Sequence, residues 1–121
     1  MRYLVDSVIL IDHFNGVLPA SEFLAAHETD CSISVVTRAE TLVGLDPDDA
    51  TAREFLDTFV TWPITVAVAD TAARLRRTHR WKLPDALQAA VAFEEGLTLV
   101  TRNTRDFKHR DPVPVETPYR V

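Results

Sequence analysis

Short apolar segments alternate with helical patterns along this chain, and this alternation limits its possible folds more than any other feature. Four segments have the composition of buried strands and end at polar or turn residues: Arg2–Val5, Ser32–Val36, Ile64–Val68 and Leu97–Thr101. Because strands joined by helices re-enter a sheet in the same direction, the sequence predicts an α/β fold. Its central sheet should be mainly parallel, with helices on both faces.

Helix start and stop signals lie between these strands. The predicted helices run from Ser21 to Glu28, Arg38 to Leu45, Asp48 to Thr61 and Asp85 to Glu95, with a further one capped by Asp70. Thr37 is placed to cap the second of these, and Glu40 three residues later would complete a capping box. Near the C-terminal end, Val113–Glu116 predicts a short edge strand, where prolines are tolerated.

Size and composition favour one domain formed by residues 1–121. The chain has 121 residues, 46% of them apolar, which suffices for a single core. We expect no membrane contact and a cytoplasmic location. No apolar stretch is long enough to span a bilayer, and the N-terminus has no basic region before a long apolar segment. The lone cysteine, Cys31, excludes an internal disulfide and a cysteine-based zinc site and is expected to be buried.

The charge of the chain is unevenly distributed. A net charge of −5 argues against generic affinity for nucleic acid. However, residues 1–73 hold three arginines against twelve acids, a balance of −9, whereas residues 74–121 hold ten basic residues against six acids, a balance of +4. Two interpretations remain open: a solvated helix face with a polar loop, or a basic rim beside an acidic centre.

Acidic or amide side chains stand close to the predicted strand ends. Asp6 ends the first strand, Glu40 lies one turn into the helix after the second, Asp85 opens the helix before the fourth, and Asn103 and Asp106 follow the fourth. Ligands of open α/β sheets bind beyond the carboxyl ends of the strands, so these residues are able to converge. Each of the four acids, taken alone, also has an ordinary structural explanation. Asp6 would be a helix cap, Glu40 a capping-box residue, Asp85 a complement to the helix dipole and Asp106 a turn residue.

Convergence of these carboxylates would require a cation. Carboxylates within a few ångströms repel one another and raise one another's pKa values, and a divalent ion removes that conflict. Oxygen ligands, with no cysteine pair and no histidine pair at helical spacing, favour Mg²⁺ or Mn²⁺ over zinc. Such ions commonly bind phosphate oxygens as well, which indicates a phosphate-containing substrate.

Four stretches stand out along nearly the whole chain, in the order YLVDSVILID, SVVTRAETLVGL, KLPDALQAAVAF and LVTRNTRDF. Together they resemble PIN-domain ribonucleases, specifically the VapC-type toxins of prokaryotic toxin–antitoxin pairs. The resemblance implies a three-layer α/β/α fold and an acidic site that binds Mg²⁺ or Mn²⁺ and hydrolyses RNA phosphodiester bonds. It also implies a homodimer and a small VapB-type antitoxin that covers the acidic groove.

The resemblance also assigns the central site residues. Metal ligands fall on Asp6, Glu40 and Asp85, and the fourth position, often an aspartate in the family, falls on Asn103. The amide at this position removes a charge. Val8 is a second departure, because the family usually has a small polar residue two places after its first aspartate.

Other polar residues are expected to support these ligands or to contact RNA. Asp12 is expected to be structural or to support a ligand, and Asp106 to supply the missing carboxylate through water. Thr101 is either a hydrogen-bond donor to a metal-binding carboxylate or to the phosphate, or an ordinary strand residue. Trp81 either stacks on a base or packs in the core. Contacts to RNA phosphates are expected at Arg80, Lys82, Arg102 and Arg105.

Two other functions remain open from the residues. A receiver-type phosphoacceptor domain has a similar length and acidity, and Asp70, after the predicted third strand, stands where its acceptor would. That chemistry requires an acidic pair after the first strand, where this chain has Asp6 followed by Ser7. The second alternative is a catalytically inactive PIN-like module that only binds protein, to which the amide of Asn103 and the apolar Val8 give weight.

Overall fold

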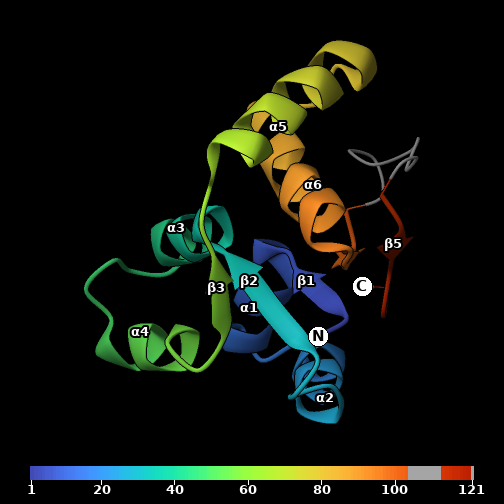
Figure 1. Cartoon of the computed structure of the whole chain (residues 1–121). Coiled ribbons are helices and arrows are strands. Elements are labelled where there is room, and N and C mark those ends of the chain that lie inside the picture. The colour runs from blue at the N-terminus through green and yellow to red at the C-terminus, as the bar shows by residue number, and fades with distance from the viewer. Residues whose placement is uncertain (104–112, 121) are drawn as a thin grey trace.

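A computed structural model describes residues 1–103 and 113–120 (Figure 1). Its elements are β1 (Tyr3–Val5), α1 (Ser7–Phe14), α2 (Leu18–Ala26), β2 (Cys31–Ser34), α3 (Val35–Gly44), α4 (Ala50–Leu56), β3 (Val60–Trp62), α5 (Val66–His79), α6 (Leu83–Glu95), β4 (Thr98–Val100) and β5 (Val115–Glu116). Two residues of the predicted site, Arg105 and Asp106, lie outside the described residues. No helix in the described ranges is long and apolar enough to cross a membrane.

The described strands form a parallel sheet in the order β3-β2-β1-β4-β5. β1 is the central strand: Tyr3 is in register with Cys31 of β2, and Val5 is in register with Val100 of β4. Because every strand runs in the same direction, all the carboxyl ends lie at one edge of the sheet. The predicted α/β fold with a parallel sheet is confirmed.

Two apolar clusters cover the two faces of the sheet, because successive side chains of a strand point to opposite faces. Leu4 of β1 packs with buried residues of α5 and α6, including Val68 and Ala89. Tyr3 and Val5 pack with buried residues of α1 and α2. The fold therefore has three layers, with α5 and α6 on one face and α1 and α2 on the other (Figure 1).

The third strand differs from the prediction. The segment Ile64–Val68 was predicted as a strand, but β3 lies earlier in the chain and α5 begins at Val66. The side chain of Thr65 caps α5 by accepting a 3.1 Å hydrogen bond from the N–H of Val68, so capping outweighs the β-branched composition. Asp70 therefore lies inside α5 and not after a strand, which overturns the receiver-type alternative.

The start of α3 also differs from the prediction. Ser34, not Thr37, caps this helix, and its hydroxyl accepts a 3.1 Å hydrogen bond from the N–H of Thr37. Thr37 therefore occupies the third helical position, where a capping-box glutamate would stand, and Glu40 lies one turn further on. The predicted capping box is wrong, and the side chain of Glu40 does not serve the helix start.

Other element boundaries agree with the prediction to different degrees. α6 begins with Pro84 in its first turn and ends at Gly96, which has the left-handed φ of 67°. The predicted C-terminal edge strand is present as β5. α2 begins three residues earlier than predicted, with Pro19 in its first turn, and α4 ends at Leu56, because the chain after it turns into β3.

Candidate active site

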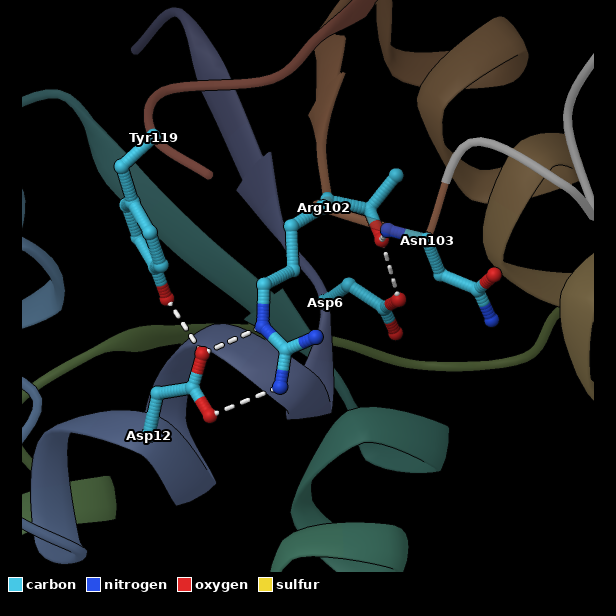
Figure 2. Close-up of polar contacts among 6 residues, drawn as sticks. Asp6, Asp12, Arg102, Asn103 and Tyr119 are labelled. Atoms are coloured by element: carbon cyan, nitrogen blue, oxygen red, sulfur yellow. Dashed lines mark hydrogen bonds and ion pairs between the residues drawn. The ribbon is translucent and has the colours of Figure 1, made fainter. Parts of the chain in front are cut away.

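Asp6 directly follows the central strand and caps α1. Its Oδ1 accepts a 2.8 Å hydrogen bond from the N–H of Ser7, so the helix-cap explanation of this residue holds in the structure. The carboxylate has further partners. Thr101 donates its hydroxyl to Oδ2 at 2.8 Å (Figure 2), and Nε2 of Gln88 lies 3.4 Å from Oδ1. Donors from three parts of the chain therefore fix the orientation of this carboxylate.

Glu40, on α3, lies in the same region. The hydroxyl of Ser7 donates to its Oε1 at 3.3 Å. Burial raises the pKa of Glu40, and the negative charge of Asp6 raises it further, whereas the hydrogen bond from Ser7 acts in the opposite direction. The two carboxyl groups therefore share a partly buried space, and their charges oppose each other.

A buried polar network links Asp6 to the sheet, and the sequence analysis missed its central member, Gln88. The side chain of Gln88 is 1% exposed. Its Oε1 accepts a 2.5 Å hydrogen bond from the hydroxyl of Ser34, and its Nε2 donates to the hydroxyl of Thr37 as well as approaching Asp6. The hydroxyl of Thr37 donates in turn to the carbonyl of Val5 at 3.2 Å. Each buried amide atom of Gln88 therefore has a partner.

Asp85 stands half-buried in the first turn of α6. It precedes Gln88 by three residues, which places both on one face of the helix. In the sequence DALQAA, the single glutamine among alanines was the signal from which the role of Gln88 could have been predicted.

Within residues 1–103 and 113–120, no group of three or more Asp, Glu, His or Cys side chains is arranged to hold a metal ion. The structure therefore brings Asp6 and Glu40 together and does not place Asp85 with them in a ligand cluster.

The segment after β4 contacts α1 at two points. The fully buried Thr101 donates to Asp6, and its hydroxyl oxygen accepts a 3.0 Å hydrogen bond from the N–H of Asn103. Arg102 turns to the other side and pairs with Asp12, so the side chains of Arg102 and Asn103 point in different directions (Figure 2). Asn103 is exposed at the sheet edge where Asp6 ends β1.

Asp12 is a buried acid that forms an ion pair with Arg102. Nε and Nη2 of Arg102 donate to its two oxygens at 2.6 and 3.0 Å, and the hydroxyl of Tyr119 donates to Oδ2 at 2.7 Å (Figure 2). The hydrogen bond from Arg102 is the main reason why the pKa of Asp12 lies below its ordinary value, against the effect of burial. Burial, followed by the contact with Asp12, raises the pKa of Tyr119. The sequence analysis missed Tyr119, which belongs to no motif.

Basic residues surround the junction of α5 and α6. Arg80 ends α5 with a left-handed φ of 58°, and it lines an open hollow of about 530 Å³ together with Ala73, Arg76, Arg77 and Leu83. Lys82 is exposed beside this hollow. Trp81 is 7% exposed and stacks on His79 with ring centroids 4.4 Å apart. Of the two predicted roles of Trp81, the structure therefore shows core packing.

Comparison with known proteins identifies the family. Residues 3–111 match the family model of the PIN domain. Over 114 residues, which cover 86% of this chain and 84% of the relative, the chain is 39% identical to Ribonuclease VapC10 of Mycobacterium tuberculosis. A chain of a toxin–antitoxin complex from Klebsiella pneumoniae has a TM-score of 0.89 at 36% identity, with coverage of 99% of this chain and 100% of that chain. A DNA-bound VapBC structure from Salmonella typhimurium has a TM-score of 0.85 at 19% identity, covers 98% and 99% of the two chains, and supports the fold alone. This chain belongs to the PIN-domain family.

Proposed function

We propose that this protein is a Mg²⁺- or Mn²⁺-dependent endoribonuclease and the toxin of a VapBC-type toxin–antitoxin pair. The observation that carries the proposal is the position of Asp6 beside Glu40 at the carboxyl end of the central parallel strand. The identity of 39% to a protein named as a ribonuclease, over most of both chains, supports it.

The donor chemistry at this edge fits a hard divalent cation. Asp6 and Glu40 offer carboxylate oxygens, and a cation between them would relieve the repulsion that contributes to the raised pKa of Glu40. Mg²⁺ commonly keeps several waters and is held by one or two carboxylates plus substrate phosphates. We propose Asp6, Glu40 and Asp85 as its ligands, bound directly or through water, and Asn103 as a source of an amide oxygen. A bound ion would lower the pKa of a water for attack on phosphorus and offset charge on the phosphate oxygens.

The protein's own residues hold Asp6 in a fixed orientation. Ser7, Thr101 and Gln88 together contact both of its oxygens, so the carboxylate does not have to reorganise when ligand binds. Alternatively, Asn103 is proposed to orient the attacking water, and Asp106, outside the described residues, is proposed to add its charge through water. Attack of water on phosphorus in line with the 3′ oxygen would form a P–O bond, break the P–O3′ bond and release the 3′ oxygen as a hydroxyl, so the expected products carry 5′-phosphate and 3′-hydroxyl ends.

Basic residues are proposed to hold the RNA strand. The hollow lined by Arg76, Arg77 and Arg80, with Lys82 beside it, concentrates positive charge in an otherwise acidic protein. Contacts of this kind position a nucleic acid through its phosphates without reading its bases. Arg102 is proposed to contact a phosphate near Asp6, and Arg105, outside the described residues, to do the same.

A VapB-type antitoxin and a second copy of the chain are the proposed protein partners, with a cytoplasmic location. A hollow of about 290 Å³ bounded by α1, α2 and α4 carries apolar side chains, Phe55 and Phe59 among them. It offers a surface for an antitoxin segment that extends over the acidic edge. The likeness to a chain from a toxin–antitoxin complex supports this partner.

The second candidate function is a catalytically inactive PIN-like module that binds protein. Two observations favour it: the amide of Asn103, and the lack of a group of three metal-binding side chains among the described residues. The two functions differ in a single activity, namely metal-dependent cleavage of RNA.

Cleavage of a mixed pool of single-stranded and structured RNA tests the proposal. Purified protein is incubated with Mg²⁺, Mn²⁺ or EDTA, beside the variants Asp6→Asn and Asp85→Asn, and the RNA ends are mapped. We expect metal-dependent cuts with 5′-phosphate ends that both variants lose. Asp57→Asn is the matched control, because Asp57 is an exposed acid paired with Arg38 away from the site. Absence of cutting and of metal binding by folded protein would favour the inactive module.

A further inference from the structure

Residues 101–103 are joined to both ends of α1. Thr101 donates to Asp6, which caps the start of the helix, and Arg102 donates two hydrogen bonds to Asp12 in its second half. Asp12 is buried, with a side chain 8% exposed, whereas the side chain of Arg102 is 34% exposed. The acid therefore acts as a fixed internal anchor, and the arginine remains accessible from outside.

Tyr119 adds a third hydrogen bond to the same anchor. It follows β5, the edge strand that pairs with β4, and its hydroxyl donates to the Oδ2 of Asp12 that Nε of Arg102 also contacts. The contact joins positions 107 residues apart in the chain. The C-terminal segment therefore contributes directly to the orientation of Asp12 and, through it, of Arg102.

The guanidinium of Arg102 is held along one edge. Its Nε and Nη2 face Asp12, and Figure 2 shows the third nitrogen, Nη1, pointing away from Asp12. Because a guanidinium is rigid and planar, fixing one edge fixes the direction of the other.

We propose that Asp12 and Tyr119 are positioning residues for Arg102, and that they hold its Nη1 edge as a contact for a phosphate of the RNA strand next to Asp6. This inference rests on the ribonuclease function proposed above. It differs from a purely structural role, because it predicts an effect on RNA binding in addition to any effect on stability. The RNA affinity of the enzyme should depend on a hydroxyl in its C-terminal segment.

A double-mutant cycle on RNA cleavage tests the inference. The variants are Tyr119→Phe, which removes only the hydroxyl, Arg102→Lys, which keeps the charge without the planar fork, and the two combined. At saturating Mg²⁺ we expect each single variant to raise KM for a cleaved oligonucleotide by about tenfold with kcat nearly unchanged. The double variant should be no worse than the stronger single one, because Tyr119 acts through Arg102.

Two controls distinguish the positioning of Arg102 from a general effect of positive charge and from a loss of protein stability. Arg120→Gln removes an exposed positive charge from the same segment and should leave KM unchanged. Thermal unfolding of every variant reports stability. The inference is overturned if Tyr119→Phe lowers the unfolding temperature without changing KM, or if the two KM effects multiply in the double variant. If the wild type neither binds nor cleaves RNA, the proposed function and this inference both fail, whereas cleavage with an unchanged KM overturns this inference alone.

Discussion

The hydroxyl of Thr101 donates a 2.8 Å hydrogen bond to Oδ2 of Asp6, which joins the carboxyl ends of the neighbouring parallel strands β4 and β1. The other oxygen of Asp6 contacts the N–H of Ser7 and the amide of Gln88. A carboxylate held in this way is prepared for a ligand before the ligand arrives. The orientation of Asp6 is therefore the property on which activity should depend most strongly.

Thr101→Val removes the hydroxyl and keeps the shape of the side chain. Because Asp6 loses a donor, we expect RNA cleavage to fall by roughly 10–100-fold. The N–H of Asn103 also loses its acceptor. We therefore expect the free energy of unfolding to fall by about 1–3 kcal/mol. Single-turnover cleavage and urea unfolding measure the two effects. Thr98→Val, at the start of β4 and away from Asp6, is the matched control, and an equal loss of activity there would contradict the prediction.

Gln88→Met replaces a buried amide with an apolar side chain of similar length. The hydroxyl of Ser34 loses its acceptor and the hydroxyl of Thr37 loses a donor, so we expect the free energy of unfolding to fall by about 1–3 kcal/mol. Cleavage should fall as well, because the amide also contacts Asp6. Denaturant titration and the RNA assay check both. Leu87→Met, at the adjacent position of α6, should leave activity intact, and a wild-type rate in Gln88→Met would disprove the link to Asp6.

Glu40→Gln tests the electrostatic conflict with Asp6. Since burial and Asp6 raise the pKa of Glu40 above its ordinary value of 4.5, the folded protein holds this proton more tightly than the unfolded chain does. The free energy of unfolding of the wild type should therefore fall as the pH rises from 4.5 through the raised pKa. Without divalent cations, we expect the variant to unfold at a higher temperature than the wild type at pH 7 and at the same temperature near pH 4.

Thermal unfolding across this pH range measures the difference between Glu40→Gln and the wild type. Glu54→Gln, which changes an exposed glutamate on α4, is the control for replacing a glutamate by glutamine. A gain for Glu40→Gln of the same size at both pH values would contradict the prediction, because it could not come from ionisation.

Arg102→Met should destabilise the fold far more than loss of an exposed ion pair does. It leaves the buried Asp12 without its cation, at an expected cost of about 3–5 kcal/mol in the free energy of unfolding. Arg38→Met, which breaks the 2.8 Å pair with the exposed Asp57, should cost at most about 1 kcal/mol. Urea unfolding measures the loss of stability in both variants. An equal loss in Arg102→Met and Arg38→Met would contradict this prediction.

The cost of Arg102→Met should also depend on pH. Because the pKa of Asp12 lies below its ordinary value of 3.8, the stabilisation by Arg102 is fully present above pH 3.8. It is lost as the pH falls through the pKa of the folded state. The difference in the free energy of unfolding between the wild type and Arg102→Met should therefore decrease in strong acid. A difference that stays constant would show that the variant is destabilised by lost packing and not by loss of the ion pair.

The overall fold and the sheet edge that carries the candidate site were predictable from local sequence. Apolar runs that end in an acid or an amide placed Asp6 and Asn103 at the carboxyl end of β1 and just after β4, and Pro84 and Gly96 marked the limits of α6. The segment ITVAV has the β-branched residues of a strand, yet Thr65 makes it the start of α5. The composition of this segment did not reveal that a helix cap at Thr65 competes with its preference for a strand.

The network around the acids was less predictable, because its contacts are tertiary. Gln88 and Asp6 are 82 positions apart, and Tyr119 and Asp12 are 107 positions apart, so no local pattern connects them. Trp81 illustrates the same limit, since only the packing of α5 on α6 determines that its ring is buried.

Binding of Mn²⁺ to the free protein, followed by electron paramagnetic resonance, tests most directly whether Asp6 and Glu40 share a divalent cation. The account predicts a Mn²⁺ site in the wild type whose affinity falls by about 10-fold or more in Asp6→Asn and in Glu40→Gln. The control Asp57→Asn should bind as the wild type does. Equal affinity of the wild type and Asp6→Asn would contradict the account.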